Sequence, residues 1–227
     1  MVDGGSTGHH PVGTLPPRPA SPGARGRVRP RTEPGPPAQP TVHTAPCRDV
    51  AELDVVFDPR DPASHCWCQV DRMPLARFDA LDDEERRGLL ARELHELPVP
   101  GIVARLGDER VGWCSVAPRS RFGRLRGCAA TRAPDTAADD PGVWSATCFV
   151  VRPGYGHHGV APALLAGAVE HARSGGAGWL EAYPVEQAAR AASSGERHRG
   201  TLAMFRAAGF EVVARPCPGR AIVRLEL

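Results

Sequence analysis

The chain has 227 residues, a formal net charge of +2 and 41% hydrophobic residues, enough for one well-buried domain with some length left over. So small a net charge gives no overall field to attract nucleic acid or an acidic membrane. No apolar run reaches the roughly 18 residues of a membrane span, and the N-terminus lacks the apolar stretch of a secretion signal. We therefore expect a cytoplasmic protein, monomer or homodimer, without a membrane or nucleic acid partner.

Residue usage is strongly biased. The chain contains neither Lys nor Asn, and Ile occurs only at Ile102 and Ile222. Avoidance of AT-rich codons accounts for this bias and indicates a bacterium with a GC-rich genome. Because every basic side chain other than His is Arg, an Arg by itself does not signal phosphate binding. The seven cysteines are odd in number and lack paired spacing, so we expect free thiols.

Residues 1–46 are rich in Pro, Gly, Ser, Thr and Arg, and runs such as Leu15-Pro16-Pro17-Arg18-Pro19 hold neither a helix nor a central strand. They contain too few apolar side chains to offset the entropy lost on ordering. We predict a disordered, mildly basic tail there and a folded domain over residues 47–227. The arginines from Arg25 to Arg31 leave contact with an acidic partner open, although composition favours a solvated tail.

Hydrophobic periodicity, turn residues and capping signals predict the elements of the domain. In its first part we expect a helix over 50–57, a strand over 65–70, a helix over 82–97 and a hairpin of strands 102–106 and 110–116. In its second part we expect a strand over 143–151, a helix over 159–173, a strand over 179–183, a helix over 200–208 and strands over 210–214 and 221–227. This order indicates an α/β domain with mixed strand pairing.

One segment carries most of the functional information. The strand ending in Val151-Arg152-Pro153 meets a Gly-rich turn, Gly156-His157-His158-Gly159-Val160-Ala161, which opens directly into an amphipathic helix. Such a junction aims several backbone N–H groups and the positive end of a helix at one point, which suits a diphosphate. The segment resembles the acyl-CoA-binding segment of the GNAT (GCN5-related N-acetyltransferase) family.

The resemblance implies the GNAT fold: a central mixed, mostly antiparallel sheet flanked by helices, with strands splayed apart at the acyl-CoA site. Its co-substrate would be acetyl-CoA or another acyl-CoA, and it implies no metal. The small residues Gly159 and Ala161 would let the backbone approach the pyrophosphate. Gly156 departs from the Arg or Gln that the family usually carries there. The residues implied in cofactor binding are Phe149, Val150, Val151, Gly156, His157, His158, Gly159, Val160, Ala161 and Phe205.

In the family, a neutral amine attacks the acyl carbon directly, within a ternary complex. The leaving-group acid is usually a Tyr, and here Phe205 occupies that position and has no proton to donate. Glu181 and Tyr183 share one face of a strand beside the splay, so Glu181 could accept the ammonium proton and Tyr183 could replace the acid. His198 could contact the cofactor or move a proton. An exposed Glu, a core Tyr and a surface His remain the alternatives.

Cysteines raise two further hypotheses. Cys148 lies in the strand that the resemblance places at the splay, where a thiol nucleophile would form an acyl-enzyme, although packing is favoured for a buried Cys. The run His65-Cys66-Trp67-Cys68 could supply zinc ligands, but no second pair at tight spacing completes a site. As part of a strand, Cys66 and Cys68 would point to one face, and core packing is favoured.

Two functions remain open at this point. The first is an acyl-CoA-dependent N-acyltransferase acting on a primary amine, which could belong to a small metabolite, an aminoglycoside-like antibiotic or a protein. The second is a non-catalytic acyl-CoA-binding module on the same fold, which Gly156 and Phe205 motivate. Asp71 or Asp79 could recognise a cationic acceptor, although solvated surface acids are the simpler interpretation.

Overall fold

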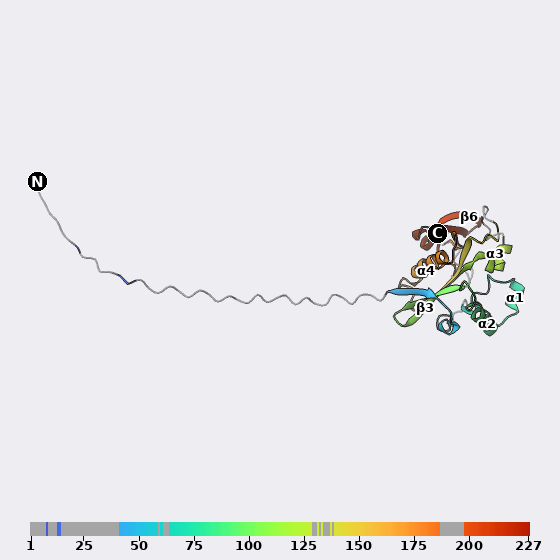
Figure 1. Ribbon diagram of the computed structural model, residues 1–227, viewed down its shortest axis with the longest axis horizontal. Helices are drawn as coiled ribbons and strands as arrows, with labels where there is room; N and C mark the ends of the chain where they lie inside the picture. Colours follow the sequence, from blue (N-terminus) through green and yellow to red (C-terminus); the bar gives the residue numbers. More distant parts are fainter. Residues whose placement is uncertain are drawn as a thin grey trace. The chain divides into compact units, whose positions relative to one another are not determined.

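The computed structural model of the protein is shown in Figure 1. It describes residues 41–58, 60, 64–128, 131, 133, 137, 139–186 and 198–227, together with Gly8, Gly13 and Thr14. The chain divides into two units, Met1–Ala38 and Gln39–Leu227, and the elements described below all belong to the second. The predicted disordered tail therefore lies outside the described residues up to residue 40, apart from the three named here.

Within the described residues, seven strands form one open sheet in the order β1-β2-β3-β4-β5-β7-β6. The strands are β1 Val42–Pro46, β2 Gly101–Leu106, β3 Glu109–Pro118, β4 Val143–Val151, β5 Trp179–Ala182, β6 Glu211–Cys217 and β7 Arg220–Glu226. Neighbouring strands are antiparallel except for β4 and β5, which are parallel. The predicted mixed, mostly antiparallel sheet is confirmed.

The helices are α1 Leu75–Asp79, α2 Asp83–Glu93, α3 Gly123–Gly127, α4 Val160–Ser174 and α5 Leu202–Ala207, with 3-10 turns at Val50–Glu52, Ser64–Cys66 and Arg119–Arg121. Asp82 caps α2 in a capping box, in which the Asp82 and Glu85 side chains each accept the other residue's N–H at 2.8 Å. Among the described residues, no helix has the length and apolar character needed to cross a bilayer.

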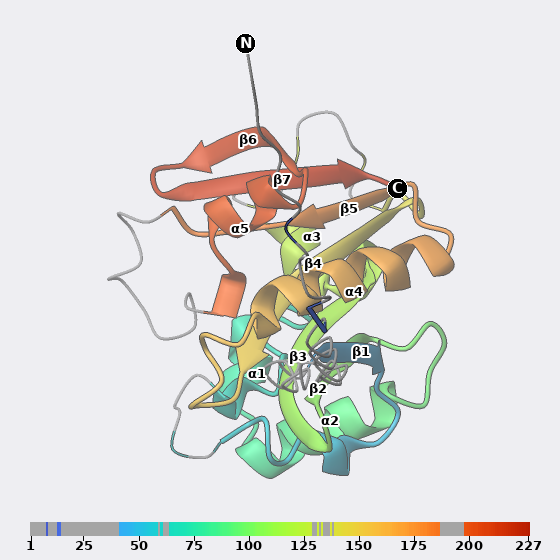
Figure 2. The ribbon, with the colours of Figure 1, turned by 90° about the vertical axis from the view of Figure 1, so that its left-hand side faces the viewer.

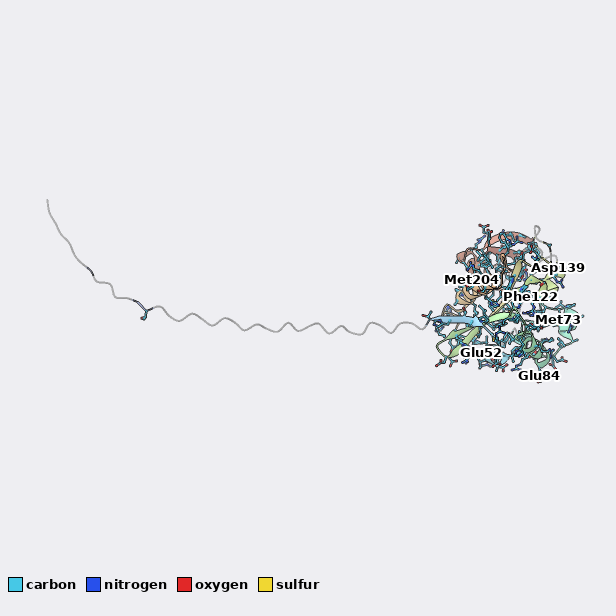
Figure 3. All side chains as sticks on the ribbon, viewed as in Figure 1. Glu52, Met73, Glu84, Phe122, Asp139 and Met204 are labelled. Carbon is cyan, nitrogen blue, oxygen red and sulfur yellow. The ribbon has the colours of Figure 1, made fainter. Side chains whose placement is uncertain are left out.

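Helices cover both faces of the sheet. Figure 2 shows α4 crossing β3 and β4 on one face, where Leu164, Leu165 and Ala168 of α4 join Phe205 of α5 in the largest core cluster. On the other face, α2 and α3 cover two smaller clusters. Figure 3 shows Phe122, which is fully buried beside α3, well inside the domain, whereas the exposed Glu84 lies at its rim.

The domain begins earlier than predicted. Residues 42–46, assigned from composition to the tail, form β1 at the edge of the sheet, where Thr44 lies opposite Ala104 of β2. Composition misses this strand because its burial is shallow and one-sided, so it lacks an apolar run. Pro46 is tolerated because it ends an edge strand.

The strand predicted over 65–70 is wrong. Ser64–Cys66 is a 3-10 turn, and the next two residues, Trp67 and Cys68, adopt left-handed φ angles of 45° and 54°. The Gln69 N–H donates to the Cys66 carbonyl at 2.8 Å and closes the turn. The helix predicted over 50–57 is reduced to the 3-10 turn Val50–Glu52. In both places, tertiary packing of Phe57 and Trp67 overrides the local pattern.

The packing of α4 against the sheet depends on a close approach at Gly167. A Cβ there would lie 2.3 Å from Thr44 Oγ1 and 2.8 Å from Ile102 Cδ1. We predict that Gly167→Ala lowers the free energy of unfolding by about 1–3 kcal/mol, because overpacking outweighs the gain in helix propensity. Gly88, inside α2, has open space around its Cβ position, so Gly88→Ala should raise it by about 0.5–1 kcal/mol. Urea denaturation of both variants measures the difference, and equal effects would contradict the close approach.

Candidate functional site

The two parallel strands at the centre of the sheet pair over a short distance only. Within the described residues, the β4–β5 ladder runs from Val143 opposite Trp179 to Ala146 opposite Ala182. Beyond it, β4 continues to Val151 against β3 alone. The chain after β5 turns instead to other partners, because Val185 bridges to Thr201 and Arg220. The sheet therefore splays open on the β5 side of residues 147–151.

The edge of β4 that faces the splay carries polar groups. The first unpaired residue, Thr147, has a buried hydroxyl without a hydrogen-bond partner in the part of the chain described. The Phe149 carbonyl points into the splay, where His198 Nδ1 lies 3.1 Å away. Phe149 and Val150 are buried. The splay strand thus offers backbone and side-chain groups to a polar chain lying along it.

The turn between β4 and α4 leaves several donors unused. The Tyr155 N–H donates to the Arg152 carbonyl at 3.1 Å, and the His158 N–H donates to the Tyr155 carbonyl at 3.3 Å. Among the described residues of this turn and the helix start, the N–H groups of Gly156, His157, Gly159, Val160 and Ala161 have no partner, and neither does that of Gly154 before them.

These donors stand at the positive end of a 15-residue helix. Gly159 caps that helix with a left-handed φ of 73°, a conformation that glycine adopts without strain. His157 and His158 are exposed at the same turn. The turn has features that favour an anion, although the His158 N–H is used inside the turn itself. Binding of the cofactor here stays a prediction.

The remaining residue predicted to bind the cofactor lies behind the splay strand. Phe205 is fully buried, and its ring makes edge contacts with Phe149 at 5.7 Å and Phe210 at 5.2 Å between centroids. It therefore supports β4 from the α5 side. A phenol hydroxyl is missing from this position, as the sequence shows.

The structure brings Glu181 and Tyr183 together at the last paired residues of β5. The Tyr183 hydroxyl donates to Glu181 Oε2 at 3.1 Å and lies 3.0 Å from Ser145 Oγ. Glu181 is also bound on both sides, by Arg119 Nη1 at 2.8 Å and by Arg224 Nη2 at 2.7 Å. The exposed fractions of the three charged side chains are 0%, 3% and 6% for Glu181, Arg119 and Arg224. The two arginines and Glu181 are referred to below as the buried charge triad.

These contacts bear on the predicted catalytic roles. Burial and the nearby Glu181 carboxylate raise the pKa of Tyr183 far above that of a free phenol. Its proton is held by Glu181, and both oxygens of Glu181 already accept hydrogen bonds from guanidinium groups. The catalytic roles of both residues stay predictions. Their surroundings favour support of the splay over proton transfer.

Three thiols gather on the face of β4 that is turned away from α4. Cys66, Cys68 and Cys148 hydrogen bond with one another, and Trp113 Nε1 donates to Cys68 Sγ at 3.3 Å. Hydrogen bonds from the other two thiols lower the pKa of Cys66, whereas hydrogen bonds with Cys66 and Cys68, followed by burial, raise the pKa of Cys148. Among the described residues, no group of three or more His, Cys, Asp or Glu side chains is arranged to hold a metal ion.

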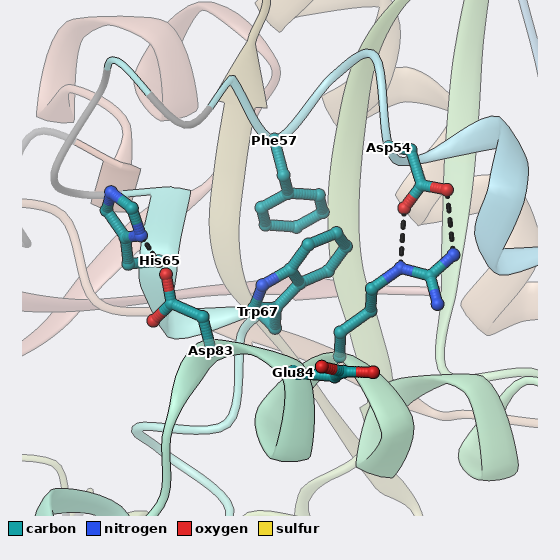
Figure 4. A pocket seen from close by; sticks show the side chains of 7 residues that line it. Asp54, Phe57, His65, Trp67, Asp83 and Glu84 are labelled. Atoms are coloured by element: carbon teal, nitrogen blue, oxygen red, sulfur yellow. Dashed lines mark hydrogen bonds and ion pairs between the residues drawn. The ribbon is translucent and has the colours of Figure 1, made fainter.

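Two cavities adjoin this region. The first, of about 280 Å³, is drawn in Figure 4. Phe57 and Trp67 stack in it at 4.6 Å, and Asp54 binds Arg87 through two hydrogen bonds of 2.6 and 2.7 Å. The second, of about 210 Å³, is lined by Asp71, Arg124, Leu125, Cys128, Thr131, Tyr183, Arg199, Cys217, Arg220 and Ala221.

The sequence suggested two acidic residues that could recognise a cationic acceptor. Asp71 is paired with Arg199 at 2.7 Å, whereas Asp79 is exposed on α1.

Sequence reasoning missed the arginines that build this site. Arg119 and Arg224 of the charge triad lie 62 and 43 positions from Glu181 in the chain. Arginine is also so frequent here that no local signal sets these residues apart. The one available hint was the place of Glu181 inside a strand predicted beside the splay, because a carboxylate that is buried there requires a cation nearby.

The fold and the site define an α/β domain in which two parallel strands splay beside an anion-binding helix start. The family model of the GNAT acetyltransferases matches residues 65–193, more than half of the chain. The protein therefore belongs to the GNAT family, and the resemblance inferred from its sequence is confirmed. Comparison with curated protein sequences finds no significant match.

Solved structures agree on the fold. PaiA N-acetyltransferase from Thermoplasma acidophilum, in complex with coenzyme A, is 11% identical with a TM-score of 0.50 over 82% of this chain and 99% of its own. Ribosomal-protein-alanine N-acetyltransferase from Brucella melitensis is 19% identical, with the same TM-score and coverage. A GCN5-related N-acetyltransferase from Kribbella flavida is 17% identical, again with a TM-score of 0.50, over 82% and 98% of the two chains. Identities this low show the fold alone.

The charge triad generates a prediction about stability. Glu181→Gln keeps the shape of the side chain but removes the carboxylate charge that both buried guanidinium groups, of Arg119 and Arg224, bind. We expect a loss of about 3–5 kcal/mol in the free energy of unfolding. The matched control is Glu170→Gln, which removes an exposed ion pair with Arg173. This control should change the free energy of unfolding by less than about 0.5 kcal/mol. Urea denaturation measures both. A Glu181→Gln protein as stable as the control, yet without turnover, would restore the catalytic role.

Proposed function

We propose that this protein is an N-acyltransferase that moves an acetyl or other short acyl group from acyl-CoA to a primary amine. The observation that carries the proposal is the combination of unused N–H groups at residues 156–161 with the unpaired edge of β4. The N–H groups would receive the diphosphate, and the edge of β4 would hydrogen bond to the pantetheine amides. Membership of the family supports this assignment. The coenzyme A complex of the structurally similar Thermoplasma acidophilum protein supports acyl-CoA as the acyl donor. It does not identify the amine.

The predicted catalytic residues divide by their contacts. The Phe149 carbonyl accepts a hydrogen bond, so His198 Nδ1 carries the proton and, in the neutral ring, Nε2 is the basic atom. We assign to His198 the removal of the ammonium proton, directly or through a water molecule. The amine then attacks the thioester carbon, a C–N bond forms and the C–S bond breaks. The nitrogen gives up its second proton to the departing CoA thiolate or to solvent, so no dedicated acid is required. Glu181 and Tyr183 hold β5 in place.

The wider setting follows from the same proposal. The reaction needs acyl-CoA and an amine, with no metal, and we retain the expectation of a cytoplasmic monomer or homodimer. Direct transfer in a ternary complex requires the amine to reach the carbonyl from the face opposite α4, where the second cavity opens beside Tyr183.

A non-catalytic acyl-CoA-binding module is the second candidate. Two observations favour it: Phe205 replaces the usual acid, and the proton of Tyr183 is held by Glu181. Such a module would bind acetyl-CoA and release no free thiol with any amine. Thiol release by the wild-type protein therefore decides between the two candidates.

Gly159 provides the first test. Gly159→Ala adds strain at φ 73° and a methyl group beside the unused N–H groups. We expect the Kd for acetyl-CoA to rise about tenfold or more, the equivalent of one lost charge-assisted hydrogen bond. Gly107→Ala is the control, since Gly107 has a φ of 59° at a distant hairpin and open space around it. Calorimetry measures both affinities. Equal affinities, or no binding by wild type at millimolar acetyl-CoA, would contradict the proposed carrier site.

His198 provides the second test. His198→Asn keeps a donor near the Phe149 carbonyl but removes the basic atom. We predict an unchanged Kd for acetyl-CoA and a fall in kcat of about a hundredfold or more, as is usual for loss of a general base. The control is His171→Gln, because His171 Nε2 also contacts a carbonyl, that of Val99, at 2.8 Å. Thiol release across a panel of primary amines gives kcat. Undiminished turnover by His198→Asn would show that His198 moves no proton.

A further inference from the structure

Three cysteines from two distant parts of the chain meet on the face of β4 that is turned away from α4. Cys66 ends the 3-10 turn Ser64–Cys66, Cys68 follows it two residues later, and Cys148 lies on β4. Their thiols hydrogen bond with one another. We call these three residues the thiol cluster. The acyl transfer proposed above assigns no role to any of them.

The turn that carries the first two thiols is held in a costly conformation. Trp67 and Cys68 have left-handed φ angles of 45° and 54°, which residues other than glycine rarely adopt. The Trp67 ring stacks on Phe57 at 4.6 Å, and the Cys68 N–H donates to Cys66 Sγ at 3.4 Å. Strain of this kind persists only where the surrounding packing imposes it, and it is concentrated at functional sites. The fold therefore keeps both thiols beside β4 despite the cost.

The three thiols are not equivalent. Cys66 is the one member of the cluster that is partly exposed, whereas Cys68 and Cys148 are buried. Hydrogen bonds from Cys148 and Cys68 lower the pKa of the Cys66 thiol, and together they outweigh the opposing effect of burial. Hydrogen bonds with Cys66 and Cys68, followed by burial, raise the pKa of Cys148. Cys66 therefore carries the thiolate, the form of cysteine that attacks electrophiles, and Cys148 stays protonated beside it.

Cys148 is a better partner for Cys66 than Cys68 is. Trp113 Nε1 donates to Cys68 Sγ at 3.3 Å, so Cys68 has a contact of its own to keep. A bridge from Cys66 to Cys68 would also close a small ring across Trp67, whose backbone is already strained. A bridge from Cys66 to Cys148 joins two elements far apart in the sequence, and disulfides that close long loops stabilise most.

We propose that Cys66 and Cys148 form a redox-active pair, which hydroperoxides oxidise to a disulfide. The bridge would tie the turn at Cys66 to β4 between Thr147, the first unpaired residue of the splay, and Phe149. A partly exposed thiolate with a second thiol in contact is the usual arrangement of a peroxide-sensitive cysteine. This inference does not rest on the proposed acyl transfer.

The oxidation proceeds in two balanced steps. The Cys66 thiolate attacks one oxygen of hydrogen peroxide, an S–O bond forms, the O–O bond breaks, and the departing hydroxide takes up the proton that Cys66 released. Cys66 is then a sulfenic acid, and the peroxide has been reduced to water. The Cys148 sulfur attacks the Cys66 sulfur, an S–S bond forms, the S–O bond breaks, and hydroxide leaves as water with the proton of Cys148. A thiol reductant reverses the product by thiol–disulfide exchange.

The experiment uses the full-length wild-type protein, fully reduced and then freed of reductant. Hydrogen peroxide is added in small excess, the remaining thiols are blocked with N-ethylmaleimide at successive times, and mass spectrometry locates each product. We expect a cross-linked peptide pair that contains Cys66 and Cys148 and a loss of about 2 Da from the unblocked protein, the mass of two hydrogen atoms. Dithiothreitol should restore both thiols.

Cys217 is the internal control for the rate. It is exposed and stands outside the thiol cluster. We expect Cys66 to be consumed at least about tenfold faster than Cys217, although Cys217 is more accessible, because its neighbours stabilise the thiolate of Cys66. Equal rates at the two residues would overturn the inference. A bridge that joins Cys68 to either of the other two, or oxidation of Cys66 to a sulfinic acid without any bridge, would overturn it as well.

Two matched variants identify the second thiol. In Cys148→Ser, the sulfenic acid of Cys66 should accumulate and react with dimedone, with no disulfide at Cys66. Cys114 is also buried, but it belongs to the core cluster that contains α4, so Cys114→Ser should form the Cys66–Cys148 bridge at the wild-type rate. A disulfide at Cys66 in the Cys148→Ser protein would contradict the pairing. If either variant fails to fold, the wild-type peptide map decides on its own.

Discussion

The two carboxylate oxygens of Glu181 each bind a buried guanidinium, and this charge triad sits where the central strands separate. Arg119 follows β3, Arg224 lies on β7, and Glu181 stands on β5 between them. The triad ties three elements together at the last residues of the parallel ladder. Since breaking a buried ion pair leaves an uncompensated charge, β5 is held firmly up to Ala182 and can diverge immediately after it. The parallel ladder therefore ends where the buried charge triad fixes β5, and not because the strand frays.

The candidate functional groups lie around that divergence. One face of the splay presents the helix start at residues 156–161, whose unused N–H groups favour anions. The second cavity lies on the opposite face. His198 and Arg199, adjacent in the chain, contact different parts of the site: His198 contacts the Phe149 carbonyl of β4, and Arg199 pairs with Asp71 beside the cavity.

Departures from the family pattern make sense in this setting. Phe205 occupies the position where the family usually carries an acidic Tyr, and its fully buried ring packs against Phe149 of the splay strand. Tyr183 keeps its proton because burial and Glu181 raise its pKa. Among the described residues, the imidazole of His198 contacts the strand edge through the Phe149 carbonyl. In the mechanism proposed above, orientation and deprotonation of the amine would therefore matter more than protonation of the leaving group.

The sequence by itself determined the elements whose signals are local. The strand over 143–151, the Gly-rich turn, the amphipathic helix after it and the hairpin around Gly107 each depend on neighbours in the chain, and all appear as predicted. The family followed from the same segment. The tail boundary and the strand over 65–70 failed, because an edge strand with few apolar residues and a turn held by packed aromatic rings leave no periodic signal.

Tertiary structure alone decided which charges meet. Glu181 finds Arg119 and Arg224 across 62 and 43 positions, and Asp71 finds Arg199 across 128 positions. Such encounters depend on sheet order and register, which no short window of sequence contains. In a chain whose strongly basic side chains are all arginine, position in space is what distinguishes a structural arginine from one that meets a ligand.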